Sequence, residues 1–412
     1  MRVSGIGVVS AFGTTHEAFR DALLAGTSSV APLTGFDTTG CRTTLAAEIK
    51  GFDPTPWVPP MKMRRMDRTA VYAVAMVKLA LQDAGVSIAA EGDDRRGVTI
   101  GTWTAGGGST QQFLDDLFRK GPSGAPALLF DSTVSNSAAG IAGLEHRLRG
   151  PNMTLSHKEA SGLAAIVTAV DLIREERAAS LIAGGADAIF ETFYKGHDRF
   201  AVMSADEAFS AHMAPFDSGR DGFVLGEGAF GLWVEHPGSG GDRAAHGEIL
   251  GVASSSAAVP LNAWPDRPEP LVRTMRLALE DAGLDADAVD VVYASANGTR
   301  ALDAVEAQAL TTLFGGGRAV VTSVKGALGE FGAAGVAACA AALLCGRAGR
   351  VPPIAGLSEP DPAAATLRLS RGVVDAPGPI VLVNSVASGG ALFSAVLRVD
   401  GSEPAHPESD DR

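Results

Sequence analysis

The sequence predicts an α/β fold built from two related halves, and a helix repeat and a pair of matching strand ends are the observations behind this prediction. Residues 78–86 (KLALQDAGV) return as residues 276–284 (RLALEDAGL), and each copy reads as the end of an amphipathic helix stopped by glycine. An apolar strand follows each copy after a polar linker, at 97–101 and at 291–294. A repeat at about half the chain length favours an internal duplication.

The ends of the two halves also resemble each other. Residues 226–235 (GEGAFGLWVE) and 388–398 (SGGALFSAVLR) each combine small residues with an apolar strand, and a polar glycine-rich junction lies at 237–243. We therefore divide the chain into an N-terminal half at 1–240, a C-terminal half at 244–400 and a polar tail at 401–412 that we expect to be disordered.

Local patterns predict further elements in chain order. Residues 2–9 lack the features of a signal peptide and read as a first strand. A strand at 153–155 runs through a small-residue turn into a helix at 162–174. The nearly apolar run 331–346 is glycine-rich and shorter than the roughly 20 residues that cross a bilayer, so we expect a buried helix there.

Composition excludes several classes of function. The 412 residues carry 34 Lys plus Arg against 47 Asp plus Glu, for a formal net charge of −13. Nucleic-acid binding needs clustered cations, so we do not expect nucleic acid as a partner. We do not expect a membrane either, because the longest apolar run is too short to cross one. The three cysteines, Cys41, Cys339 and Cys345, lack CxxC spacing. This favours a reduced, cytoplasmic protein without a disulfide framework or a metal site.

The turn at 156–162 lies where many enzymes present a nucleophile. A helix N-terminus offers free N–H groups and a positive potential to a residue in such a turn. Here no thiol stands at the apex. Glu159 takes that place, with Lys158 beside it and His157 two residues earlier.

Several motifs resemble those of the β-ketoacyl synthases and occur in the same order. Together they cover about 1–398, and the run RDGFVLGEG at 220–228 is long and specific. The motifs are GPN at 150–152 with ASG at 160–162, AGGAD at 183–187, PFDSGRDGFVLGEG at 215–228, NGT at 297–299 with Asp303 and Glu306, and Lys325 with Gly329 and the GAAG of 332–335.

The resemblance implies the thiolase-like fold, in which two duplicated halves form a five-layer αβαβα stack with two five-stranded sheets, and it implies a dimer. It also implies no cofactor. Working members of the family hold an acyl chain on a Cys at the turn before Ala-Ser-Gly. Two His residues polarise the thioester carbonyl while malonyl is decarboxylated.

This sequence departs from the family at each of these reactive positions. Glu159 stands at the Cys position, Asn297 replaces the His of His-Gly-Thr, and Glu330 replaces the His of Gly-His. Lys325 is kept, but the acidic residue of the following helix corresponds to Ala338. A carboxylate cannot hold the chain as a stable thioester, and Glu330 would repel an enolate. We therefore expect no independent activity.

A scaffold that is kept while its reactive residues are lost resembles the chain-length factor, or ketosynthase β subunit, of type II polyketide synthases. This resemblance implies a ketosynthase α subunit as heterodimer partner and an acyl carrier protein carrying the growing polyketide. Ser388 stands at the gate position that usually holds Phe. The usual residue at the Cys position of this group is Gln, so Glu159 indicates a divergent branch, such as one making reduced or polyene chains.

Two segments are candidates for contacts with these partners. A basic cluster lies where ketosynthases dock carrier proteins, although an ordinary solvated helix start is the alternative; it consists of Lys62, Arg64, Arg65 and Arg68. By resemblance, a second segment lies at the dimer interface and reaches the acyl tunnel; its candidate residues are Gln112, Phe113, Leu117, Phe118 and Phe130.

Other interpretations of the same residues stay open. Glu159 and His157 could form the acid–base pair of a divergent condensing or decarboxylating enzyme. A buried Glu159 near Lys158 and Lys325 could instead be a paired structural charge. The chain could also form a non-catalytic homodimer that binds acyl chains or carrier proteins.

Overall fold

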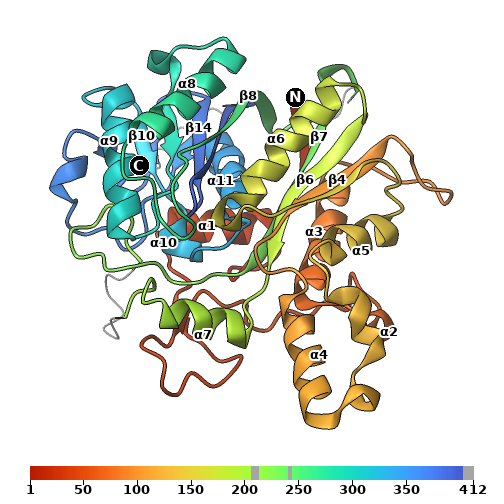
Figure 1. The fold of residues 1–412 in the computed structure, drawn as a ribbon. Coiled ribbons are helices and arrows are strands. Elements are labelled where there is room, and N and C mark those ends of the chain that lie inside the picture. The colour runs from red at the N-terminus through yellow and green to blue at the C-terminus, as the bar shows by residue number, and fades with distance from the viewer. Residues whose placement is uncertain (206–212, 240–243, 402–412) are drawn as a thin grey trace, which may run out of the picture.

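The computed structural model describes residues 1–205, 213–239 and 244–401, and its course is drawn in Figure 1. Apart from Gly401, the tail that the sequence predicts to be disordered lies outside the described residues. Part of the predicted junction lies outside them as well. The boundaries 1–240 and 244–400 therefore stay predictions.

Each half contains the same succession of strands and helices. In the first half these are β1 (Arg2–Val9), α3 (Arg68–Asp83), β4 (Arg96–Gly101), β5 (Asn152–Leu155), α6 (Ser161–Arg174), β6 (Ser180–Asp187) and β7 (Gly228–Glu235). In the second half they are β8 (Gly247–Ser256), α8 (Glu269–Ala282), β9 (Val291–Tyr293), β10 (Val320–Thr322), α11 (Ala334–Arg347), β14 (Ile380–Val386) and β15 (Ala391–Val399). The internal repeat in the sequence therefore corresponds to a repeat in the structure.

The strands follow the order β5-β4-β6-β7-β1-β8-β15-β14-β9-β10-β12, in which the second half mirrors the first. Three parallel strands lie on the far side of each half, and two antiparallel strands lie toward the centre. The halves join through β1 and β8 by two residue pairs, Arg2↔Glu248 and Val3↔Gly247. The two expected five-stranded sheets are thus present and share one narrow seam, and β12 (Arg368–Leu369) extends the outer edge.

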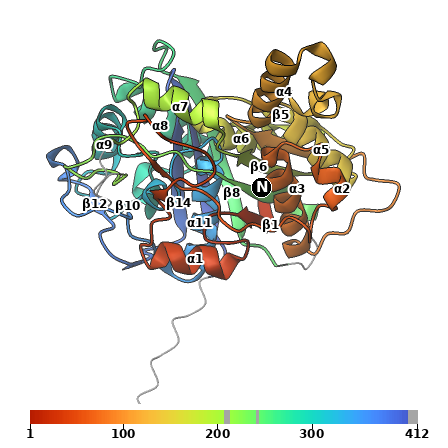
Figure 2. The ribbon, with the colours of Figure 1, turned by 90° about the horizontal axis from the view of Figure 1, so that it is seen from below.

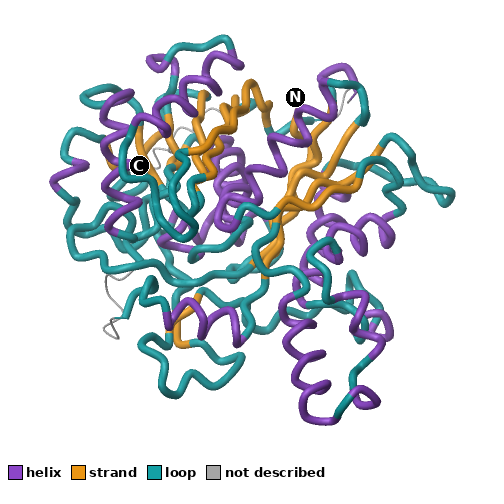
Figure 3. Tube along the Cα trace, viewed as in Figure 1, coloured by secondary structure: helices purple, strands orange, loops and turns teal. Residues whose placement is uncertain are grey.

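The helices complete five layers. α6 and α11 pack between the two sheets, which Figure 3 shows as two groups of strands with helices between and outside them. α3 and α5 (Ser137–His146) cover the first sheet, and α8 and α9 (Arg300–Phe314) cover the second. This arrangement confirms the predicted αβαβα thiolase-like fold.

Small residues allow the central layer to be thin. A Cβ on Gly162 of α6 would lie 2.7 Å from Val336, and one on Gly335 of α11 would lie 3.0 Å from Leu163. The predicted buried helix at 331–346 is α11, and Cys339 and Cys345 are buried in it. Close packing of α6 against α11 brings the N-terminal ends of both helices to the middle of the molecule.

The other elements lie around this core. The elements that the first half of the chain contributes include α4, which projects beyond the ends of the strands in both ribbon views (Figures 1 and 2). They are α1 (His16–Leu24), β2 (Ala31–Pro32), β3 (Leu45–Ala46), α2 (Pro60–Met63), α4 (Gly107–Lys120), the 3-10 helices η1 (Pro122–Gly124) and η2 (Ala127–Ser132), and α7 (Glu191–Arg199). The second half adds α10 (Lys325–Leu328), β11 (Arg350–Val351) and β13 (Val374–Asp375). Within the described ranges, no helix is long and apolar enough to cross a membrane.

Candidate functional site

The turn before α6 is a strained, tightly bonded loop with Glu159 at its apex. It contains the 3-10 helix η3 (Lys158–Ala160), in which Lys158 adopts a left-handed conformation with φ of 50°. Such a conformation is uncommon for a residue other than glycine and must be held by its surroundings. The Ser161 hydroxyl holds it by donating to the Lys158 carbonyl at 2.6 Å and accepting from the His157 N–H at 2.9 Å.

Glu159 is 2% exposed and is bonded to the gate loop. Its Oε1 accepts a hydrogen bond from Ser388 Oγ at 2.8 Å, and its Oε2 accepts one from the Ser388 backbone N–H at 3.1 Å. Burial raises the pKa of Glu159 to about 7, and the negative charge of Glu330 acts in the same direction. The expected gate residue and the expected apex residue therefore contact each other directly.

The lysine beside this carboxylate does not neutralise it. Lys158 Nζ donates to Asn262 Oδ1 and, at 3.2 Å, to Ser388 Oγ. Lys325 is paired elsewhere, with Glu330. The interpretation of Glu159 as a carboxylate paired with Lys158 or Lys325 is therefore wrong. Two polar donors of the gate loop stabilise it in place of a cation.

A second buried group forms around Glu330. Glu330 is fully buried, and its Oε2 accepts hydrogen bonds from Lys325 Nζ at 2.8 Å and from Asn297 Nδ2 at 2.7 Å. Lys325 also donates to Ser295 Oγ at 3.2 Å. Burial raises the pKa of Glu330, while the charge of Lys325 opposes that shift. The three positions that the sequence singled out as Lys325, Asn297 and Glu330 thus form one bonded cluster.

The acidic residues Asp303 and Glu306 support this cluster from α9. Asp303 accepts hydrogen bonds from the N–H groups of Asn297 at 2.9 Å and of Phe216 at 2.8 Å. Glu306 accepts from the Ser295 N–H at 2.9 Å. Burial raises the pKa of Asp303 to about 6 and that of Glu306 to about 7. Both carboxylates therefore fix the backbone of the strand end that carries Asn297.

A cavity of about 380 Å³ opens beside Glu159 and Lys158. Aromatic rings form much of its wall, and they come from separate loops and from α7 and its end. The lining residues are Trp103, Lys158, Glu159, His197, Phe200, Val202, Phe223, Asn262, Trp264 and Ser388. Sequence reasoning missed Trp103, His197, Asn262 and Trp264, because they stand in no common motif and only the fold brings them together. The cavity leads to the apex of the turn.

His157 is not part of a dyad with Glu159. Its ring packs edge-on against Phe393, with 5.3 Å between the ring centroids. Burial lowers the pKa of this imidazole. Across the described residues, the hydrogen bonds that reach the Glu159 carboxylate from other residues come from Ser388. The structure therefore does not bring the predicted acid–base pair together.

The four basic residues between α2 and the start of α3, from Lys62 to Arg68, divide into two kinds. Lys62 pairs with Glu145 at 2.6 Å, and Arg68 pairs at 2.7 Å with the buried carboxylate of Glu227. Arg64 and Arg65 are exposed. Arg68 thus has a structural role in holding Glu227, which the sequence did not indicate.

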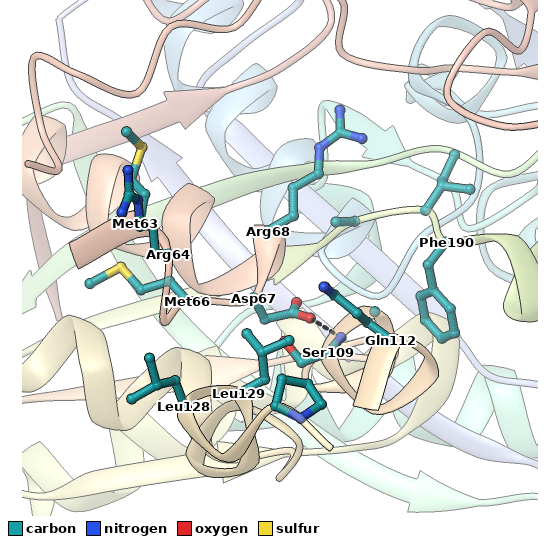
Figure 4. A pocket seen from close by; sticks show the side chains of 14 residues that line it. Met63, Arg64, Met66, Asp67, Arg68, Ser109, Gln112, Leu128, Leu129 and Phe190 are labelled. Carbon is teal, nitrogen blue, oxygen red and sulfur yellow. Dashed lines mark hydrogen bonds between the residues drawn. The ribbon is translucent and has the colours of Figure 1, made fainter. Parts of the chain in front are cut away.

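A second cavity of about 580 Å³ lies between this basic segment and the α4 region. Figure 4 shows Arg64, Asp67 and Arg68 on one side of it and Gln112 and Leu129 on the other. Asp67 caps α3 by accepting the Thr69 N–H at 3.0 Å, and it also accepts the Ser109 N–H from α4 at 2.9 Å. The candidate docking segment and the candidate tunnel segment are therefore neighbours.

The projecting part of the first half, which we call the arm, comprises α4 and η2. Its large apolar side chains face solvent: Phe118 is 81% exposed and Phe130 is 60% exposed. Phe113 and Phe130 contact each other with ring centroids 5.7 Å apart, and Leu117 lies on the same helix, half-buried. The neighbouring strand β5 forms the free edge of the sheet.

Most of the chain matches two family profiles in succession. Residues 2–236 match the β-ketoacyl synthase N-terminal domain, and residues 246–358 match the β-ketoacyl synthase C-terminal domain. The chain belongs to the β-ketoacyl synthase family. The resemblance stated from the sequence motifs is confirmed.

Relatives within the family carry two kinds of name. A 3-oxoacyl-[acyl-carrier-protein] synthase 2 of Coxiella burnetii (strain RSA 493 / Nine Mile phase I) is 31% identical over 96% of this chain and 97% of its own. A tetracenomycin polyketide synthase ketoacyl synthase beta subunit of Streptomyces glaucescens is 32% identical over 87% and 88%. The solved structure of the ishigamide ketosynthase/chain length factor matches with a TM-score of 0.89 and 28% identity over 97% and 99%.

Proposed function

We propose that this chain is the chain-length factor of a type II polyketide synthase, a ketosynthase-like subunit without condensing activity of its own. The observation that carries the proposal is the buried centre, where Glu159, Asn297 and Glu330 stand at the positions that the motif resemblance assigns to the reactive Cys and the two His residues. An active ketosynthase would be its partner, and an acyl carrier protein would deliver the growing chain to the pair.

The chemistry of these side chains supports the proposal. Condensation needs a thiolate that accepts the acyl group, and both Glu159 oxygens already accept hydrogen bonds from Ser388. It also needs hydrogen-bond donors for the developing enolate. Asn297 directs its amide N–H to Glu330 instead, and Glu330 adds a carboxylate where a donor is required. The polar groups of the centre therefore bond to one another within the chain.

The names of the relatives do not distinguish a fatty-acid-type synthase from a chain-length factor. A 3-oxoacyl-[acyl-carrier-protein] synthase 2 and a ketoacyl synthase beta subunit are about equally similar to this chain. The arm supports the polyketide role. Exposed rings at Phe118 and Phe130 are suited to burial against a partner subunit, where they would close the far end of a tunnel that belongs mainly to the partner. In this proposal Phe113, Phe118 or Phe130 forms the wall that limits chain length.

The test is reconstitution with a ketosynthase that carries the intact Cys and both His residues. Co-expression followed by size-exclusion chromatography should give a heterodimer that extends malonyl-loaded carrier protein, while the isolated chain should show no acyl adduct by intact mass. The variant Glu159→Cys should not condense malonyl units on its own, because both polarising His residues are still absent. A condensed product from the isolated native chain would contradict the proposal, as would failure to bind every ketosynthase encoded beside it.

One observation favours a second candidate, a decarboxylating enzyme. Glu159 borders the 380 Å³ cavity, and its pKa of about 7 suits a group that exchanges protons near neutral pH. If this role is right, malonyl-carrier protein is converted to the acetyl form by the native chain and not by Glu159→Ala. The chain-length role predicts no conversion by either protein when the partner is absent.

A further inference from the structure

Two histidines and an aspartate lie close together at the seam between the halves, and they are separate from the residues of the buried centre. His16 begins α1, Asp83 ends α3, and His246 directly precedes β8. One ligand atom from each of the three lies within 4.8 Å of the others. None of these residues takes part in the proposed chain-length role.

The hydrogen bonds leave this group with the lone pairs that a metal ion needs. His16 Nε2 contacts the Ile6 carbonyl at 2.8 Å, and a bond donated there leaves Nδ1 unprotonated. That Nδ1 lies 3.8 Å from Asp83 Oδ1. A backbone acceptor for the second ring nitrogen is the usual support of a metal-binding histidine.

The second histidine completes the arrangement. His246 Nε2 lies 2.7 Å from Asp83 Oδ2, and its Nδ1 is buried without a hydrogen-bond partner among the described residues. With its proton on Nδ1, His246 offers Nε2 to an ion beside the Asp83 carboxylate, the form of an aspartate that binds metals.

We propose that His16, Asp83 and His246 form a site for a divalent transition metal, with Zn²⁺ as the best match. Two imidazoles and a carboxylate are ligands of the type that zinc prefers, at about 2.0–2.2 Å from the ion. Ligand atoms around such an ion lie about 3.3 Å apart, so His16 Nδ1 would move closer to Asp83 than its 3.8 Å, and His246 Nε2 would move away from its 2.7 Å contact with Asp83. The fourth position stays open to water, because all three side chains reach solvent.

The location gives the site a structural consequence. Among the described residues, the strands of the two halves pair through Arg2↔Glu248 and Val3↔Gly247, and the His246 N–H donates to the Val3 carbonyl at 2.8 Å beside those pairs. Asp83 Oδ2 also accepts the Ile6 N–H from β1 at 2.8 Å. A bound ion would therefore tie α1 and α3 of the first half to the start of β8.

The experiment is a titration of the purified full chain, after treatment with a chelator, with Zn²⁺ and Co²⁺. We expect binding of one ion per chain by calorimetry, visible d–d absorption with Co²⁺, and a higher unfolding temperature with Zn²⁺ but not with Mg²⁺. Removing an outer-shell partner typically weakens metal binding by about 10–100-fold, so His16→Ala and His246→Ala should each weaken it by at least about 100-fold.

The matched control is His236→Ala, an exposed histidine outside the group, which should bind zinc as the native chain does. His246→Gln keeps a polar side chain and should lose the zinc response without loss of the fold, which circular dichroism checks. The proposal is overturned if the native chain gives no Co²⁺ absorption. It is equally overturned if zinc still raises the unfolding temperature of the His16→Ala/His246→Ala double variant.

Discussion

The buried centre and the arm differ in where their side chains find partners. In the centre, Glu159 bonds to Ser388 and Glu330 bonds to Lys325 and Asn297, so the contacts are made within the chain. On the arm, rings as large as Phe118 lie in solvent. Internal contacts imply selection for a stable fold at the centre, whereas an exposed apolar arm implies selection for a contact with another molecule.

The centre contains two buried carboxylates, and their negative charges are stabilised by different groups. Glu330 has the Lys325 cation at 2.8 Å, whereas the donors that reach Glu159 within the described ranges are the hydroxyl and the backbone N–H of Ser388. Removing the Lys325 cation should therefore destabilise the fold around Glu330. Removing the negative charge of Glu159 should stabilise the fold.

The largest effect is expected from Lys325→Met, which removes the cation and leaves the carboxylate of Glu330 buried without a counter-charge. Breaking a buried ion pair from one side typically costs about 3–5 kcal/mol of unfolding free energy. Urea unfolding of the purified chain at fixed concentration measures this cost. The double variant Lys325→Met/Glu330→Leu should recover most of it, since no buried charge is left. A single variant as stable as the native chain would show that Glu330 is protonated in the folded state.

Glu159→Gln should change the pH dependence of stability. The unfolded chain releases this proton near pH 4.5 and the folded chain near pH 7, so the folded state holds more protons between these values. Native stability therefore falls as the pH rises through this window, by about 3 kcal/mol from this group alone. The Gln variant should lack that part of the decline and be the more stable protein at pH 8.

Unfolding curves at pH 4.5, 6 and 8 for both proteins measure the difference. The exposed Glu269→Gln on α8 is the matched control and should follow the native profile. Identical slopes for the native chain and Glu159→Gln would mean that Glu159 is ionised throughout, as a paired carboxylate would be.

Sequence patterns predicted the fold and the turn that carries Glu159, because both depend on local features of the chain. The repeat at 78–86 and 276–284 corresponds to α3 and α8, and the turn at 156–162 holds Glu159 at its apex as predicted. The partners of individual side chains could not be predicted in the same way. Lys158 is adjacent to Glu159 in sequence, yet its left-handed backbone turns Nζ toward Asn262, more than a hundred residues away. Such long-range pairings depend on the tertiary fold.

The arm is tested by Phe113→Ala, Phe118→Ala and Phe130→Ala in the co-expressed heterodimer. A ring packed at the end of a tunnel resists displacement by about 1–3 kcal/mol, which biases release over further elongation by a factor of about 5–150. The variant that opens the tunnel should give longer products by mass spectrometry, whereas Leu114→Ala on the same helix is the control. Unchanged product lengths for all three, singly and together, would place the wall elsewhere.

The smallest effect on stability, and the sharpest contrast within one segment, is expected at the basic cluster. Arg64→Ala and Arg65→Ala remove exposed charges, which contribute about 0–1 kcal/mol each, so the unfolding temperature should stay nearly fixed. Arg68→Ala leaves the buried Glu227 carboxylate without its cation and should lower the unfolding temperature, so Arg68 should behave differently from the two exposed arginines. If the segment docks an acidic carrier protein, the Arg64→Ala/Arg65→Ala variant of the heterodimer should turn over more slowly at low ionic strength, and the difference should shrink as salt screens the charges. Arg119→Ala/Lys120→Ala on α4 removes the same two positive charges at the far end of the arm and serves as the control. Equal turnover by the native and double-variant heterodimers at low salt would leave Arg64 and Arg65 as ordinary surface residues, and the carrier protein would then dock on another face or on the partner.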